Sequence, residues 1–195
     1  MKKILISTAV ALSALTVPTA ALAQARPAIL IVDSDRVLTD CVACKSAGTQ
    51  LQSRQAALRT RAQTLQTQLQ TEGKPIQTAV DALNGKAPDA ALQARIKAFQ
   101  TKEQAAQQEL ATSQRTLEST AANVQQQIGT KLIAIVEQVR AGRGAAIVLS
   151  KNSTMANDAT IDVTTDVLNA LNQQLPAVSI TPLPQQPQQQ TPQGR

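Results

Sequence analysis

The apolar residues between Lys45 and Arg140 recur mostly at seven-residue intervals. Leu51, Leu58 and Leu65 follow this spacing, and Gln, Thr, Ser and Arg fill the positions between them. A helix with this spacing has one narrow apolar stripe, which can line a seam between two helices but cannot face a broad globular core. The same pattern resumes in the second half of the segment, so the sequence predicts two long antiparallel helices.

A turn is predicted between the two helices at residues 84–88, which read Asn-Gly-Lys-Ala-Pro. Asn84 and Gly85 can supply a left-handed C-cap, and Pro88 suits the first turn of the second helix. Asp89 would place a carboxylate at the positive end of that helix. The middle of the chain is therefore expected to fold back on itself as a helical hairpin.

The seam between the helices is weak. Arg54 and Arg61 stand where further apolar residues would be expected, and alanine is frequent elsewhere. Pro75 removes a helical hydrogen bond, so the first helix should bend there. An ordinary coiled-coil spacer and a flexible arm both fit this pattern. The bend and the weak seam favour the flexible arm.

Short apolar runs at both ends of the hairpin predict β-strands. They are residues 28–32, 145–150, 154–156 and 159–163. Thr39 and Asp40 are candidate N-caps for the first long helix. Thr164 or Thr165 could cap a last helix over residues 166–175, which Pro176 would end. These elements bury too little area to be stable alone, so association of several chains is expected.

The two ends of the chain differ from the rest in composition. Residues 1–23 form an expected secretory signal, with two lysines, an apolar run and a small-residue cleavage site ending at Ala23; Ala25 offers a second site. The signal is of bacterial type, so the mature protein is expected in the periplasm. Residues 177–195 are rich in Pro and Gln and are expected to form a disordered tail.

Composition argues against an enzyme. The 195 residues include no His, and aromatic residues make up 1% of the chain. No Ser/His arrangement, metal-ligand cluster or phosphate-binding loop is present, so no catalytic residue, metal or cofactor is expected. Between Lys45 and Arg140 there are 12 basic and 7 acidic side chains, a net charge of +5. Nucleic acid is not an expected partner, because the arm lacks aromatic stacking residues and the protein is exported.

The only cysteines form the sequence Cys41-Val42-Ala43-Cys44. In an oxidising compartment, the pair can close a local disulfide or link subunits. A redox-active pair at a helix N-terminus is a second interpretation, and a metal site is a third. The helical hairpin that follows does not resemble a thioredoxin-like domain, which argues against the redox interpretation.

Two segments carry a family resemblance. They are Ile29–Leu38 and Asp162–Asn172, and residues 144–150 also fit. On these residues the chain resembles the OmpH/Skp family of periplasmic chaperones over about residues 28–175. The resemblance implies a homotrimer whose helical tentacles enclose a cavity that holds unfolded outer-membrane proteins without ATP. The cysteine pair is not part of that family pattern.

The predicted fold class is α+β: a long antiparallel helical hairpin, or coiled-coil tentacle, projects from a small β body that forms trimers. The body comprises residues 24–44 and 141–176, and the tentacle residues 45–140. The predicted function is that of an ATP-independent holdase for unfolded outer-membrane proteins. A structural coiled-coil envelope protein and a CxxC thiol–disulfide protein remain alternatives. Lipopolysaccharide or an anionic membrane surface is a possible second partner because the arm is basic.

Two sets of candidate residues follow. Basic and apolar side chains toward the tip of the hairpin are expected to bind clients: Arg59, Arg61, Lys74, Ile76, Val80, Leu83, Lys86, Leu92, Arg95, Ile96, Lys97, Phe99 and Lys102. Apolar residues of the predicted strands are expected to be buried in the trimer: Ile29, Ile31, Val148, Ile161 and Val163.

Overall fold

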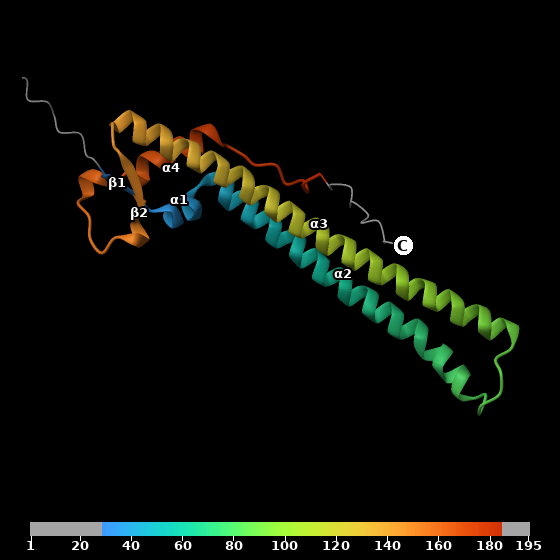
Figure 1. Cartoon of the computed structure of the whole chain (residues 1–195). Coiled ribbons are helices and arrows are strands. Elements are labelled where there is room, and N and C mark those ends of the chain that lie inside the picture. The colour runs from blue at the N-terminus through green and yellow to red at the C-terminus, as the bar shows by residue number, and fades with distance from the viewer. Residues whose placement is uncertain (1–28, 185–195) are drawn as a thin grey trace, which may run out of the picture.

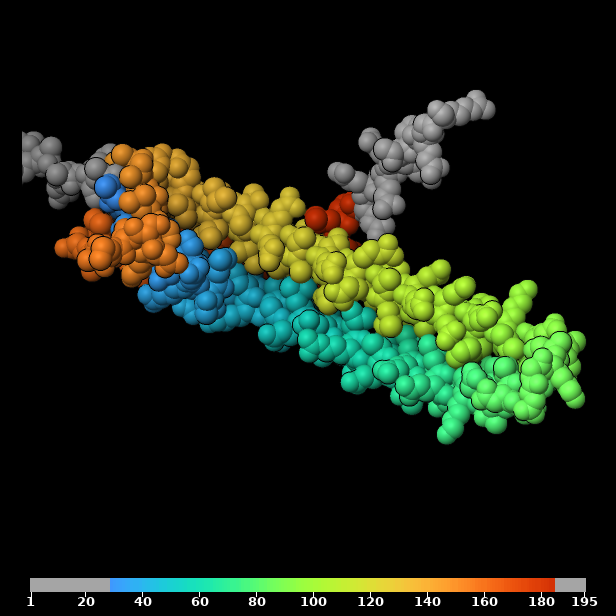
Figure 2. Space-filling model, turned by 60° about the horizontal axis from the view of Figure 1, so that its bottom comes forward, coloured from blue at the N-terminus to red at the C-terminus, as the bar shows by residue number. Residues whose placement is uncertain are grey.

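The computed structural model describes residues 29–184, and Figures 1 and 2 show a long two-helix arm that projects from a small body at one end. The expected signal peptide and the last eleven residues of the expected tail lie outside the described residues. The arm consists of α2 (Val42–Asp81) and α3 (Ala90–Arg143). The prediction of a helical hairpin on a small body is confirmed.

The turn between the helices uses the expected residues. Asn84 and Gly85 both have positive φ, 48° and 86°. Asp89 is the N-cap of α3, and its carboxylate accepts a hydrogen bond from the backbone N–H of Leu92 at 2.8 Å. Pro88 precedes this cap instead of lying in the first helical turn. The C-cap of α2 is Ala82, in the right-handed region, so Asn84 and Gly85 turn the chain after the helix has ended and do not cap it. The start of α3 is displaced by two residues from the predicted one.

The distal half of α2 contains two residues that disfavour helices. The helix continues through Pro75 without interruption, so the proposed bend there stays a prediction. Two residues earlier lies Gly73, where a Cβ atom would come within 2.9 Å of the Cζ atom of Phe99. The absence of a side chain at Gly73 thus lets the only aromatic ring of the protein lie directly against α2.

The body contains a two-stranded parallel sheet. In it β1 (Ile29–Val32) pairs with β2 (Ile147–Ser150), and Leu30 lies opposite Val148. The whole arm is the connection between the two strands. The predicted third and fourth strands are wrong. Residues 154–156 are irregular, and a short 3-10 helix, η2 (Ala159–Ile161), replaces most of the fourth.

The missing strands have a physical explanation. After β2 the chain forms a first 3-10 helix, η1 (Lys151–Ser153), instead of returning along the sheet. Only Asp162 forms a bridge to β1, opposite Ile31, and the adjacent Val163 N–H donates to the carbonyl of Ile31 at 2.9 Å. Because residues 159–161 form a 3-10 helix, this single contact does not extend into a ladder.

A short helix that was not predicted precedes the arm. Helix α1 (Ser34–Asp40) begins after Asp33, whose carboxylate accepts from the backbone N–H of Arg36 at 2.9 Å. Thr39 and Asp40 were predicted to cap the long helix. They lie instead in the last turn of α1. Cys41 takes that role, because its sulfur accepts from the N–H of Cys44 at 3.1 Å.

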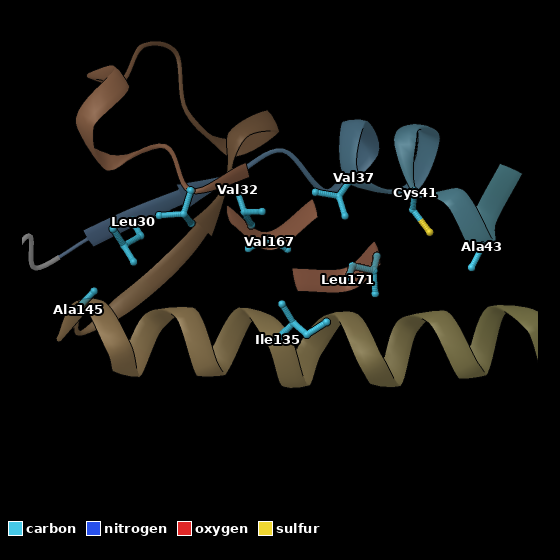
Figure 3. Packing of buried hydrophobic residues seen from close by; sticks show 10 residues of the cluster. Leu30, Val32, Val37, Cys41, Ala43, Ile135, Ala145, Val167 and Leu171 are labelled. Carbon is cyan, nitrogen blue, oxygen red and sulfur yellow. The ribbon is translucent and has the colours of Figure 1, made fainter. Parts of the chain in front are cut away.

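The last helix, α4 (Thr164–Gln174), covers the body core. Neither Thr164 nor Thr165 is its N-cap, because Val163 occupies that position without a side-chain hydrogen bond. The Thr164 N–H instead donates to Asp162 at 3.0 Å. Figure 3 shows how β1, α1, α3 and α4 contribute side chains to one core, including Val32, Val37, Ile135 and Leu171.

The chain after α4 departs from the predicted disordered tail. Residues 175–184, here called the strap, run back beside α3 (red in Figure 1). Val178 and Ile180 pack against buried residues of the arm base, and Ser179 hydrogen bonds to Gln127. The expectation of disorder is therefore wrong for residues 177–184.

One carboxylate joins three parts of the body. Asp162 accepts hydrogen bonds from the N–H of Thr164 and, at 2.9 Å, from the ammonium group of Lys151. Burial raises the pKa of Asp162, but the hydrogen bonds from Thr164 and the Lys151 charge outweigh it and lower that pKa to about 2. The ionised form therefore contributes to stability at neutral pH.

We predict that Asp162→Asn lowers the free energy of unfolding by about 1–2 kcal/mol at pH 7. A carboxyl with a lowered folded-state pKa stabilises the fold above its unfolded pKa, and this contribution is lost as pH falls through the folded pKa. Parent and variant should thus converge near pH 2. Urea unfolding at both pH values tests this. Asp158→Asn in the same loop is the comparison: Asp158 is exposed and, among the described residues, its carboxylate accepts only from Thr160, so a smaller loss is expected there. An equal loss would contradict the prediction.

Candidate functional site

Two of the candidate basic residues join the helices of the arm to each other. Arg61 makes a bidentate contact with Glu109, with N···O distances of 2.6 and 3.0 Å, and Lys102 pairs with Glu72. The hydrogen bond to Glu109 raises the pKa of Arg61, and the same bond lowers that of Glu109. These exposed pairs set the register of α2 on α3 and contribute little free energy.

The other five candidate cations are exposed: Arg59, Lys74, Lys86, Arg95 and Lys97. None of them makes an ion pair with another residue between 29 and 184. Their charges therefore face solvent from α2, the turn and α3. Such charges produce a positive field along the arm, which attracts acidic segments before contact is made.

The candidate apolar residues occupy the seam and are not freely exposed. Leu92 is buried, and the others are half-buried between α2 and α3: Ile76, Val80, Leu83, Ile96 and Phe99. Their predicted contact with clients stays a prediction, and only the exposed part of each side chain is available for it. A narrow seam on two helices uses these side chains for its own packing.

Shallow apolar grooves lie instead in the middle of the arm. The largest of three such grooves, about 540 Å³, is lined by Leu65, Leu69, Phe99 and Leu110 among others. Two more, of about 400 and 370 Å³, share the side chain of Leu58. An unfolded chain could place small apolar side chains in each of them.

Alanines explain where the grooves lie. Ala62 lines two of them, Ala57 and Ala111 one each, and the buried Ala106 lies in the largest. A methyl group at a seam position leaves space that a leucine would fill. Frequent alanine in the seam was visible in the sequence, but its consequence could be located only once the register of the helices was known.

The cations also border the grooves. Arg59 lines one groove beside Leu58, and Arg54 and Arg61 line another beside Leu117. Of these three, Arg61 is held by Glu109. Arg54 was not among the candidate site residues, although its position in the sequence placed it in the seam. Charge and apolar surface therefore occur together in the middle of the arm.

The α2 helix contains several threonines that hydrogen bond back to their own helix. Thr64, Thr67, Thr71 and Thr78 each donate to the carbonyl four residues earlier, at 2.9–3.0 Å. Such bonds weaken and bend helices slightly. Thr101 and Thr120 make the same bond in α3, so this feature is more frequent in α2 but not confined to it.

The five candidate oligomerisation residues fall into different environments. Ile31 and Val163 are buried within their own chain, and Val148 and Ile161 are half-buried. Ile29 is 41% exposed. Of the five, Ile29 is therefore the most available for the predicted contact between subunits.

Two exposed residues of β2 were not among the predicted oligomerisation residues. Ile147 and Leu149 are 45% and 37% exposed, and Ile147 lies opposite Ile29 in the sheet. All three share the outer face, because side chains alternate along a strand. The strand predicted over residues 145–150 already implied this arrangement, because alternation puts Ile147 and Leu149 on one face and Val148 on the other.

A second apolar hollow adjoins this face. It has a volume of about 400 Å³ and lies between α3 and β2, where Leu132, Ile133, Val136 and Val148 line it. Ile133 is 72% exposed. Among residues 29–184, β2 pairs only with β1. The body therefore presents an open sheet edge beside unfilled apolar surface.

The cysteines form a disulfide at the joint between body and arm. Cys41 is fully buried in the body core, and Cys44 is half-buried against the cluster of Ala47, Val124 and Ile128 at the arm base. Cys41 also caps α2, so the pair fixes the break between α1 and α2. In this position the disulfide stabilises the connection between α1 and α2.

The part of the chain that the structure describes offers no cluster of three His, Cys, Asp or Glu side chains that could hold a metal ion. In the same residues, 29–184, no helix combines the length and apolar character needed to cross a membrane. The candidate site consists of the grooves and exposed cations along the arm together with the outer face of the body.

This architecture is similar to that of known proteins. Residues 28–171 match the family model described as outer membrane protein (OmpH-like). The chain belongs to this OmpH-like family. No curated protein sequence matches it.

A solved structure has the same fold as this OmpH-like chain. It is a protein of Caulobacter crescentus CB15, described as a candidate outer membrane chaperone (OmpH-like). The two are 19% identical, with a TM-score of 0.66 over 82% of this chain and 92% of the other. At this identity the likeness extends to the fold alone.

Proposed function

We propose that this OmpH-like protein is a periplasmic holdase that binds unfolded outer-membrane proteins without ATP. The supporting observation is the surface of the arm, which combines shallow apolar grooves with cations that have no partner in residues 29–184. A surface of this kind suits many weak contacts with a chain of varied sequence. It does not offer the enclosed, specifically shaped pocket that small ligands require.

The body supports the proposed assembly as a homotrimer. Ile29, Ile147 and Leu149 form an exposed apolar face, and the adjoining hollow and open edge of β2 could receive another copy. A two-stranded sheet is marginally stable alone, which adds to the reason for association. Three arms from one such body would enclose a cavity that carries a charge of about +15 if each arm contributes +5.

The alternative of a coiled-coil spacer predicts a different surface. A spacer needs a well-filled seam, whereas the middle of this arm has alanines and open grooves. The alternative of a thiol–disulfide enzyme is disfavoured by Cys41, which is fully buried and caps α2. The exposed cations would also attract lipopolysaccharide or an anionic membrane surface, which we retain as a second class of partner.

The test is an aggregation assay with an outer-membrane β-barrel protein diluted from urea. We expect the mature protein, added at one proposed trimer per client, to suppress light scattering almost completely, equally with and without ATP. The same barrel protein, already folded in detergent, is the control and should not bind. Aggregation that proceeds unchanged would contradict the holdase proposal and leave the spacer.

A further inference from the structure

The strap is held mainly through its backbone. The side-chain amide of Gln127 makes two hydrogen bonds to Ser179: its oxygen accepts from the Ser179 N–H at 2.9 Å, and its nitrogen donates to the Ser179 carbonyl at 3.1 Å. One amide thus satisfies both backbone groups of one strap residue. Such a bidentate contact fixes an extended segment without reading its side chain.

Two further hydrogen bonds continue along the same helix. Asn123 donates from its amide to the carbonyl of Thr181 at 2.9 Å, and the N–H of Leu183 donates to the hydroxyl of Ser119 at 2.9 Å. In both cases α3 supplies a side chain and the strap supplies its backbone. Any extended polypeptide could therefore replace the strap in these bonds.

The spacing of these contacts is matched between helix and strap. The three residues of α3 are four positions apart, which is about 6 Å along a helix. The three residues of the strap are two positions apart, which is about 6.6 Å along an extended chain. The strap runs antiparallel to α3, so each step along one element meets a step along the other. This agreement is what a binding site for extended peptides requires.

Below the hydrogen bonds lies an apolar floor. Val178 and Ile180 of the strap pack against a cluster formed by Ala47 of α2 and Val124 and Ile128 of α3. These two strap residues are half-buried, while the residue between them is exposed. The floor therefore selects apolar side chains two positions apart, and the backbone bonds accept any sequence around them.

We infer that this face of the arm base is a binding site for extended polypeptide segments with apolar side chains at alternate positions, and that the strap occupies it in cis. Ser119, Asn123 and Gln127 form the polar side of this site, here called the strap groove. The groove exists independently of the holdase proposal; its use by clients rests on that proposal. Segments that become β-strands with one apolar face have the required alternation.

The strap suits the role of a displaceable occupant. It is held by four hydrogen bonds to α3 and by a few half-buried side chains. Fixing each residue costs conformational entropy comparable with the net gain of one hydrogen bond. Pro182 and Pro184 reduce that cost because their φ angles are already restricted. The balance leaves the strap able to exchange with another extended segment.

The experiment measures binding of a labelled peptide with the sequence of residues 177–184 to full-length proteins. The parent should bind it weakly, because the strap competes at high effective concentration. A variant with Val178→Asp and Ile180→Asp, whose own strap is released, should bind it at least tenfold more tightly. Adding Asn123→Ala and Gln127→Ala to that variant should remove the gain. Equal binding by all three proteins, or by none, would overturn the inference.

A second measurement does not depend on releasing the strap. Hydrogen exchange of the Ser179 amide should become at least tenfold faster in Gln127→Ala, while exchange of the Leu171 amide in α4 stays unchanged. Unaltered exchange at Ser179 would refute the proposed clamp.

Competition identifies the natural ligand class. An unlabelled peptide with apolar residues at alternate positions should displace the labelled peptide from the released variant. A peptide of the same composition with those residues adjacent should not. If both fail while the strap peptide still binds, the groove serves the strap alone and its use by clients is refuted. Failure of the aggregation assay with peptide binding intact would instead refute the holdase proposal.

Discussion

Reversing three exposed charges on the arm should slow client capture about tenfold at low salt. The variant combines Arg59→Glu, Arg95→Glu and Lys97→Glu, residues that are exposed and unpaired in the described part of the chain. The net charge of the arm then changes from +5 to −1. Because charge acts over about 8 Å at physiological salt, capture by the parent should also slow as salt is added. Stopped-flow mixing with a labelled, acidic unfolded barrel measures both effects.

The dissociation rate provides the internal comparison. Apolar contacts in the grooves near Leu58 and Leu65 are not screened by salt, so dissociation should change much less than capture. The matched control exchanges the same positions while keeping charge: Arg59→Lys, Arg95→Lys and Lys97→Arg. Capture that ignores both salt and charge reversal would exclude electrostatic attraction as the first step. Lys102 is left out because it pairs with Glu72.

The paired cations and the unpaired cations of the arm have different surroundings. Arg61 and Lys102 connect the helices, while Arg59, Arg95 and Lys97 face solvent. No property of the sequence alone separates these groups, because an arginine that meets a glutamate across a hairpin is 48 positions away from it. The separation appears only when the register of α2 against α3 is known.

The strongly periodic parts of the chain were predictable. Seven-residue spacing predicted the hairpin, and Asn84, Gly85 and Asp89 predicted its turn, because these signals act over a few residues. The strands β1 and β2 were predicted from compact β-branched runs. Local chemistry was sufficient in each of these cases.

The failures share a different cause. Residues 154–156 and 159–163 have strand-like composition but no neighbouring strand to complete a ladder. The strap has the composition of a disordered tail, yet side chains of α3 satisfy its backbone. The break at Cys41 depends on packing in the body core. In each case a partner distant in sequence decides the structure, and composition does not report it.

The client-binding residues stay a prediction. Cations and a weak seam were predictable from the sequence, and apolar contacts were predicted near Ile76 and Ile96, which are half-buried in the hairpin. Shallow grooves also lie nearer the middle of the arm, where Ala62 and Ala106 line one of them. The position of these grooves depends on the register of α2 against α3, which sequence periodicity does not report.

The outer face of the body should control assembly. We predict that Ile147→Asp combined with Leu149→Asp converts the proposed trimer to monomers, because two carboxylates would have to be buried in the contact. Both side chains are exposed in the single chain, so the chain itself should keep its helical content. Light scattering for mass and circular dichroism for fold check the two parts. Client capture should fall to the background level, since three arms no longer surround one space.

Two controls separate the body face from other causes of dissociation. Met155→Asp places the same charge on a fully exposed body residue and should leave the assembly intact. Replacing residues 60–115 by the turn residues 84–88 shortens the arm without touching the face, and this variant should also remain trimeric. Monomers from the shortened arm would show that the arms hold the assembly. A trimer that persists with both aspartates would place the contact between subunits elsewhere on the body. Either outcome would contradict the role assigned to Ile147 and Leu149, because that role requires the small body to hold three long arms by its apolar face.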